Sequence, residues 1–161
     1  MRTAGILMPI TSLPSPYGVG TLGQCARDFI QFLHRAGQTY WQILPICPTG
    51  YGDSPYQSFS SYAGNPYMID FDDLKKEGLL QEEEYASISW GDNPARVDYS
   101  LLYSHKFSIL RIACSRISGV LSERFQTFCK EQNVWLNDYA LYMSIKDYYG
   151  GQSWQEGPET L

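Results

Sequence analysis

Residues 40–67 read YWQILPICPTGYGDSPYQSFSSYAGNPY and contain the clearest structural signal in the chain. The first seven of these residues are mostly apolar or aromatic, which is typical of a strand buried in a sheet. From residue 47 onward glycine, proline, serine, asparagine and aspartate become frequent, and these residues favour turns and oppose helix. The stretch therefore predicts a buried strand at 40–46 that leads straight into a long loop at 47–67.

The loop of residues 47–67, called the aromatic loop below, carries four tyrosines and a phenylalanine. Connections longer than about 12–15 residues are usually functional or disordered, and this loop is too aromatic to be disordered. Flat rings lie well against the C–H faces of sugars, and short polar side chains hydrogen-bond sugar hydroxyls. The composition therefore favours a binding surface for a polyhydroxylated ligand over a loop whose rings only fill gaps.

Upstream of residue 40 the sequence predicts another strand and a helix. Residues 5–10 form a short apolar run, and apolar residues recur at helical spacing from Leu22 to Ala36. Strand, helix and strand with a short return predict a βαβ unit with parallel strands and a right-handed crossover. Ligands of parallel α/β folds bind beyond the carboxyl ends of the strands, so residues 11–20 and the aromatic loop are the expected binding loops.

Downstream of the aromatic loop the pattern becomes mainly helical. The expected elements are a short strand at 67–71, short helices at 72–78 and 81–86, a long helix with Asp98 as N-cap, a helix capped by Ser122 and a helix over 134–149. Two strands do not make a stable parallel sheet alone. The sequence thus predicts an α/β protein with its first βαβ unit at 1–70 and a mainly helical subdomain at 71–161, as in the first third of a larger protein.

Charge and hydropathy argue against two kinds of partner. The net charge of −5 argues against nucleic acid, which is bound by patches of lysine and arginine. No run of about 18 apolar residues exists, so no membrane span is expected. The apolar run at the start of the chain is too short for a secretion signal, which predicts a cytoplasmic location.

The four cysteines are Cys25, Cys47, Cys114 and Cys129. None is in a C-x-x-C pair and the chain has two histidines, so a zinc site is disfavoured and no metal is expected. Cys25, Cys114 and Cys129 fall within helical patterns and are expected to be buried free thiols, as in a reducing cytoplasm.

Residues 18–23, GVGTLG, match the G-x-G-x-x-G pattern of dinucleotide-binding folds and precede a helix. The loop before them is too long for the tight first turn of that motif. No acidic residue follows the strand at 40–46, where a ribose would be bound. Nucleotide binding is therefore disfavoured.

Carboxylates that could break a glycosidic bond are scarce. Such chemistry usually needs two carboxyl groups that flank the bond. Asp53 is the only carboxylate between residues 29 and 69. Asp70, Asp72 and Asp73 stand at the start of an expected helix, where N-capping explains them better. The residues alone give no catalytic pair, and no G-x-S-x-G motif of a serine hydrolase is present.

Eight segments together carry a family resemblance. They are TSLP at 11–14, YGVG at 17–20, YWQILP at 40–45, PTGYGDSPYQSFS at 48–60, AGNPY at 63–67, RVDY at 96–99, LLY at 101–103 and WLNDYALY at 135–142. These segments closely resemble the start of amylomaltases, the 4-α-glucanotransferases of glycoside hydrolase family 77. The resemblance covers essentially the whole chain, and the motif in the aromatic loop is long and specific.

The resemblance implies a (β/α)₈ TIM barrel with inserted helical subdomains. The chain would supply the first two parallel strands and their crossover helix. The activity implied is retaining transfer of α-1,4-glucan segments between maltooligosaccharides or starch through a covalent glycosyl-enzyme intermediate, without a cofactor. The family's nucleophilic aspartate, acid/base glutamate and stabilising aspartate lie on later barrel strands, and no residue here matches them. We therefore expect the N-terminal part of such an enzyme, with no catalytic residue and no activity alone.

The same resemblance implies roles for five residues. Tyr56 is expected to stack on the sugar at the donor subsite beside the cleaved bond, with Ser54 and Asp53 as polar neighbours. Tyr51 and Tyr103 match positions of a further glucan contact on the flanking surface. Two alternatives are a non-catalytic carbohydrate-binding module with a closed fold of its own, and a structural half that docks on the rest of a barrel.

Overall fold

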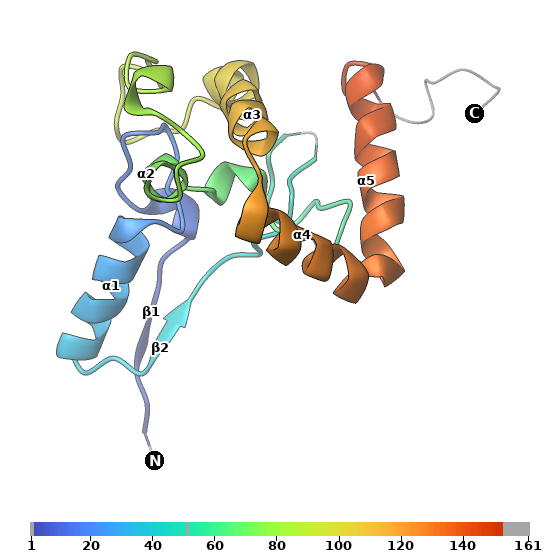
Figure 1. The fold of residues 1–161 in the computed structure, drawn as a ribbon. Helices are drawn as coiled ribbons and strands as arrows, with labels where there is room; N and C mark the ends of the chain where they lie inside the picture. Colours follow the sequence, from blue (N-terminus) through green and yellow to red (C-terminus); the bar gives the residue numbers. More distant parts are fainter. Residues whose placement is uncertain (1, 51, 153–161) are drawn as a thin grey trace. The chain divides into compact units, whose positions relative to one another are not determined.

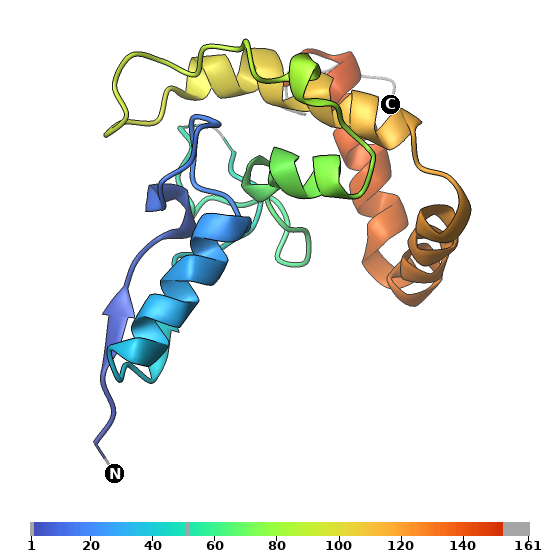
Figure 2. The ribbon, with the colours of Figure 1, turned by 60° about the vertical axis from the view of Figure 1, so that its left-hand side comes forward.

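A computed structural model describes residues 2–50 and 52–152 (Figure 1 and Figure 2). The described elements, with η for a 3₁₀ helix, are β1 (Gly5–Leu7), η1 (Ile10–Ser12), α1 (Gln24–Arg35), β2 (Tyr40–Gln42), η2 (Pro66–Met68), α2 (Phe71–Lys76), η3 (Glu82–Glu84), α3 (Tyr99–Ser115), α4 (Gly119–Glu131) and α5 (Asn133–Tyr148). The chain divides into two compact units, Met1–Ile117 and Ser118–Leu161.

The first unit begins with the predicted βαβ arrangement. β1 and β2 pair in parallel, with Gly5 opposite Tyr40, and α1 connects them. Both strands are shorter than expected. The ladder reaches only to the bond from Met8 N–H to Gln42 O, at 3.0 Å. Pro9 follows β1 and Pro45 follows β2, and neither has an N–H group that could donate a further ladder bond.

The core of this unit forms where α1 covers the strands. Ile10, Leu13, Ala26 and Met68 are buried together, and the ring of Trp41 packs against them. The Trp41 indole N–H donates to Met8 O at 2.8 Å, which leaves its polar atom satisfied. The residues beyond both strand ends are therefore held by a continuous apolar cluster.

The strand expected at 67–71 is wrong. Pro66 starts η2, and the Asn65 side chain caps it by accepting from Tyr67 N–H at 3.0 Å. Asp70 then caps α2 by accepting from the N–H groups of Asp72 and Asp73. Because η2 occupies residues 66–68 and α2 begins at residue 71, no room is left for a strand. The N-capping role of Asp70 is confirmed.

α3 is the long helix of the first unit. Asp98 caps it by accepting from the N–H groups of the second and third helical residues, as predicted. Its buried stripe is Leu102, Lys106, Ile109 and Ala113. This stripe closes a further cluster in which Leu102 packs with residues of the 11–20 loop and η2.

The second unit contains α4 and α5. Ser118, whose backbone is extended, is the N-cap of α4, so the predicted cap at Ser122 is wrong. Ser122 lies inside the first turn, where a residue has helical rather than capping backbone angles. Neither helix has a fully buried side chain among its described residues.

The buried thiols expected from the helical patterns are also wrong for two positions. Cys25 and Cys114 are exposed, while Cys47 and Cys129 are half-buried, and all four are free. Ala26 and Ala113 take the core positions of α1 and α3 instead. A neighbour in sequence is rotated by about 100° around a helix, which turns these two cysteines toward solvent.

Among the described helices, none combines the length and the apolar character needed to cross a membrane.

Candidate functional site

The aromatic loop follows the carboxyl end of β2 (Figure 1) and is closed at its base. Asn65 N–H donates to Ile46 O at 2.7 Å, which joins the two ends of the loop. Inside the loop Gly50 N–H donates to Gln57 O at 3.0 Å. A loop whose ends meet and whose interior is hydrogen-bonded resembles an extended Ω-loop, and loops held by a scaffold in this way frequently carry function.

Tyr56 stands at the tip of a tight turn in this loop. Its backbone N–H donates to Ser54 Oγ at 3.3 Å, and Gln57 N–H donates to Ser54 O at 3.1 Å. The Tyr56 side chain is 73% exposed. The turn therefore fixes the backbone and presents a flat ring to solvent with a serine beside it.

Asp53 has the opposite environment. It is half-buried, and its Oδ1 accepts a hydrogen bond from the hydroxyl of Tyr103 on α3. The ring of Tyr103 lies 5.9 Å from that of Tyr67 and 6.5 Å from that of Tyr99, between ring centres. The structure thus joins Asp53 and Tyr103, which are fifty positions apart in the sequence.

The phenols around Asp53 are held in their protonated form. Burial, followed by the hydrogen bond and the negative charge of Asp53, raises the pKa of Tyr103 well above its ordinary value. Burial raises the pKa of Tyr67 and Tyr99 as well, and the charge of Asp53 adds to both effects. These three hydroxyls are therefore donors throughout the physiological pH range.

A small cavity lies beneath the aromatic loop. Its volume is about 40 Å³, and its lining includes Thr49, Asp53, Asn65, Tyr67 and Tyr99. This is room for water but not for a sugar ring. A sugar bound to this part of the chain would have to lie on the outer surface of the loop, where Tyr56 is exposed.

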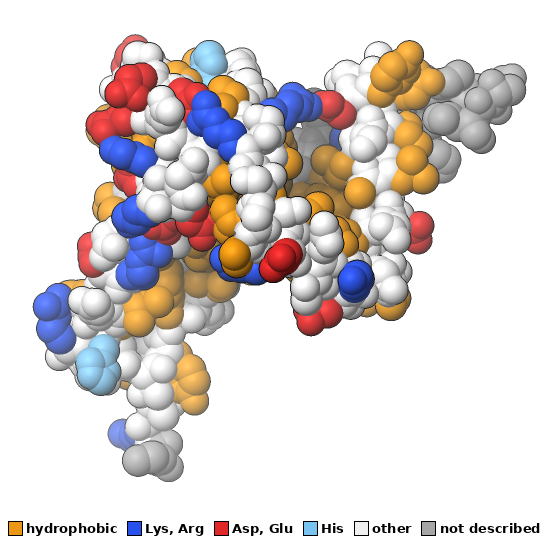
Figure 3. Space-filling view, in the orientation of Figure 1, with side chains coloured by type: hydrophobic (Ala, Val, Ile, Leu, Met, Phe, Trp, Pro, Cys, Tyr) orange, Lys and Arg blue, Asp and Glu red, His pale blue; other side chains and the backbone are white. Residues whose placement is uncertain are grey.

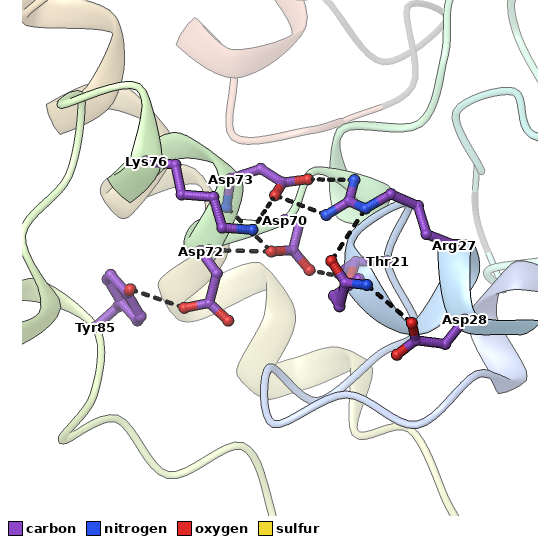
Figure 4. Close-up of polar contacts among 9 residues, drawn as sticks. Thr21, Arg27, Asp28, Asp70, Asp72, Asp73, Lys76 and Tyr85 are labelled. Atoms are coloured by element: carbon purple, nitrogen blue, oxygen red, sulfur yellow. Dashed lines mark hydrogen bonds and ion pairs between the residues drawn. The ribbon is translucent and has the colours of Figure 1, made fainter.

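Several carboxylates elsewhere in the first unit are paired with other side chains (Figure 4). Asp73 forms two hydrogen bonds with the Arg27 guanidinium, at 2.8 and 2.9 Å, and Lys76 donates to it as well. The Arg27 bonds lead the causes that lower the pKa of Asp73 to about 2. Asp72 accepts from the Tyr85 hydroxyl at 3.1 Å. These groups tie α1, α2 and η3 together, and among the described lining residues of the cavity Asp53 is the one carboxylate.

The glycines of the G-x-G-x-x-G pattern are explained by packing inside the chain. A Cβ on Gly20 would lie 1.9 Å from Ile10 O, and a Cβ on Gly23 would lie 1.9 Å from Asp70 Oδ2. The same Asp70 oxygen accepts from the Thr21 hydroxyl at 2.5 Å (Figure 4). These two glycines therefore allow close contacts with a backbone carbonyl and with the Asp70 side chain, and nothing in this arrangement requires a phosphate.

Comparison with known proteins decides the family. A family model described as 4-alpha-glucanotransferase (Glyco_hydro_77) matches residues 8–161. The chain belongs to the 4-α-glucanotransferase family. The resemblance seen in the sequence is thereby confirmed.

Individual relatives of this family agree with the assignment. A 4-alpha-glucanotransferase of Thermus thermophilus is 48% identical over 164 residues, which cover 99% of this chain and 32% of that protein. One of Clostridium butyricum is 46% identical over 147 residues, 91% of this chain and 30% of that protein. The amylomaltase from Streptococcus agalactiae, solved in complex with acarbose, aligns with a TM-score of 0.94 at 40% identity, over 99% of this chain and 32% of its own. The chain spans about a third of the length of these glucanotransferases.

The glucanotransferase residues predicted from the sequence fall into two groups. Ser54 and Tyr56 share one turn, and Asp53 and Tyr103 share one hydrogen bond. Tyr51 lies outside the described residues. Because Asp53 and Tyr103 stand on separate elements, no local pattern predicts the hydrogen bond between them.

Lys106 is the buried residue that sequence reasoning missed. It lies on the stripe of α3 that also holds Leu102, Ile109 and Ala113. Its position at i+4 from Leu102 was a signal that could have placed it in the core.

Within the described residues, no group of three or more His, Cys, Asp or Glu side chains is arranged to hold a metal ion.

Proposed function

We propose that this chain forms part of a 4-α-glucanotransferase and supplies one wall of its glucan-binding site. The single observation that carries this proposal is the exposed Tyr56 ring beside Ser54, on a hydrogen-bonded turn at the carboxyl end of a parallel strand. Flat ring faces and hydroxyl partners suit an α-1,4-glucan, whose sugars present C–H faces and hydroxyl rims. A maltooligosaccharide or a starch chain is the proposed ligand, and the similarity to an amylomaltase that was solved in complex with acarbose supports a sugar ligand.

The fold we propose for the complete enzyme is a (β/α)₈ barrel. β1, α1 and β2 would be its first units, at residues 1–70, and residues 71–161 would be an inserted, mainly helical part. Apolar side chains remain exposed on and around the βαβ unit (Figure 3), and they are Ile6, Leu7, Ile30, Phe32, Ile43 and Ile46. Exposed apolar surface of this kind is what neighbouring barrel units would cover.

In this proposal the chain binds and orients the glucan. Retaining transfer needs two carboxyl groups about 5 Å apart. Among the described residues that line the cavity, Asp53 is the one carboxylate, and its Oδ1 accepts from the Tyr103 hydroxyl. We therefore assign the catalytic carboxylates to other parts of the complete enzyme. No cofactor enters the proposed reaction, and free thiols fit a cytoplasmic location.

The test is disproportionation of maltotriose by the complete enzyme with Tyr56→Ala. Loss of the stacking ring is expected to lower kcat/KM by about tenfold or more, since about 1.4 kcal/mol of transition-state binding corresponds to a factor of ten. The matched control is Tyr148→Ala, which removes an 82% exposed ring from α5 and should leave kcat/KM unchanged. An unchanged kcat/KM for Tyr56→Ala would defeat the assignment of this loop.

A further inference from the structure

Asp53 has an unusual backbone for a residue with a side chain. Its φ is 54°, and it is the one non-glycine residue with a positive φ among those described. Aspartate and asparagine tolerate this left-handed conformation better than other side chains. Gly52, just before it, also has a positive φ, of 80°, so the chain reverses sharply here. In this conformation the Asp53 carboxylate reaches the hydroxyl of Tyr103.

The carboxylate is used to fasten the loop to a helix. Its Oδ1 accepts from the Tyr103 hydroxyl, and the Thr49 hydroxyl lies 3.5 Å from the same oxygen. Most of the other hydrogen bonds described for the aromatic loop stay within it, such as those of Ser58 and Ser60. The bond to Tyr103 instead reaches α3.

The helix that supplies the donor is firmly held. Leu102, the neighbour of Tyr103, has no exposed surface. One turn further on, the Lys106 ammonium donates to Ile69 O at 2.8 Å. The Tyr103 ring itself packs on Tyr67. The hydrogen bond from Tyr103, on a packed helix, to Asp53 therefore holds the aromatic loop at one point.

The hydrogen bond between Asp53 and Tyr103 lies directly before the turn that carries Tyr56. Ser54 is the next residue after Asp53, and its Oγ and carbonyl oxygen accept from the N–H groups of Tyr56 and Gln57. A shift of Asp53 is therefore transmitted to the Tyr56 ring over three residues of chain. Holding such a group to within about 0.5 Å is what productive binding of a substrate requires.

We propose that Asp53 is a positioning residue, which latches the turn of Ser54 and Tyr56 to Tyr103 of α3 and so sets the place of the stacking ring. The role rests on the proposed function, because the ring is useful only if a glucan binds to it. The carboxylate acts through Tyr103 and Tyr56 and does not touch the sugar. This differs from a direct substrate contact by Asp53, which the family resemblance alone suggests.

The experiment is a mutant cycle in the complete enzyme with maltotriose. Tyr103→Phe keeps the ring but removes the donor, and Asp53→Ala removes the acceptor. Each is expected to lower kcat/KM about tenfold, and the double variant no further, because both break one bond. Asp53→Asn, which keeps an acceptor oxygen and tolerates the left-handed backbone, is expected to retain activity within about threefold. Tyr148→Phe is the control for loss of a tyrosine hydroxyl.

Two readouts separate positioning from general damage. In a Tyr56→Ala background, Tyr103→Phe should cause no additional loss, since the ring that it positions is gone. Amide exchange of residues 54–57 should quicken in Tyr103→Phe and in Asp53→Ala but not in Asp53→Asn. A fall in kcat/KM of about a hundredfold in the double variant, the product of the two single losses, would overturn the proposed role of Asp53. The same conclusion would follow if Asp53→Asn lowered kcat/KM as much as Asp53→Ala while Tyr103→Phe left it unchanged.

Failure of the proposed function would look different. An unsubstituted complete enzyme that does not disproportionate maltotriose would contradict the function. The latch would still be decided by amide exchange, because unchanged exchange at residues 54–57 in Tyr103→Phe would overturn it whatever the activity.

Discussion

At the residue scale, Lys106 shows most clearly how burial changes chemistry. Its side chain has no exposed surface, its ammonium donates to Ile69 O, and it lies 4.1 Å from the centre of the Phe71 ring. Burial lowers the pKa of Lys106 to about 7, although the charge of Asp70 acts in the opposite direction. A lysine in the core therefore makes the stability of the fold depend on pH.

The sign of this dependence follows from proton counts. The unfolded chain holds the Lys106 proton up to about pH 10.5 and the folded chain only up to about pH 7. Between these values the unfolded state binds more protons, so Lys106 makes stability rise with pH by about 1.4 kcal/mol per unit. Lys106→Met should remove this part of the slope. Urea unfolding of both proteins at pH 7, 8 and 9 measures it, and parallel curves for the two proteins would contradict the buried-lysine account.

At the scale of elements, side-chain contacts between α1 and α2 add to the strand pairing of the first unit. Asp70 caps α2 with one carboxylate oxygen and accepts from Thr21 with the other, while Arg27 of α1 pairs with Asp73 (Figure 4). The backbone of Gly23 lies against Asp70 so closely that no side chain fits there. Two short strands are thus supplemented by polar contacts between α1 and α2.

Gly23→Ala tests this arrangement. The new methyl would meet Asp70 Oδ2 at 1.9 Å, which would displace the carboxylate from its cap and from Thr21. We expect a loss of about 2 kcal/mol in the free energy of unfolding, as for other overpacked sites. Gly64→Ala is the matched control, since nothing lies within 4 Å of its Cβ position. Equal stability of the two variants in urea unfolding would show that the Asp70 contacts do not support the fold.

Several of these elements could be predicted from the sequence and others could not. The periodicity of apolar residues predicted the helices α1 and α3. The N-caps Asp70 and Asp98 could be predicted because each bonds to backbone N–H groups only two and three residues further along the chain. The strand expected at 67–71 failed because Pro66 and Asn65 stabilise a 3₁₀ turn that apolar alternation does not reveal. The link between Asp53 and Tyr103 depends on tertiary packing, which no local pattern contains.

At the scale of the whole molecule, the chain matches about a third of each relative in length. Its described residues present the exposed ring of Tyr56 on the aromatic loop and one carboxylate at the cavity beneath. This combination suits holding a glucan and lacks the pair of carboxyl groups that bond cleavage requires. We therefore propose that these residues bind the glucan and that other parts of the enzyme break its glycosidic bond.

Maltotriose incubated with the 161-residue chain alone, and separately with the complete enzyme, tests this proposal directly. We expect glucose and longer maltooligosaccharides from the complete enzyme and unchanged maltotriose from the chain alone. Longer products from the chain alone would contradict the claim that the catalytic carboxylates lie elsewhere.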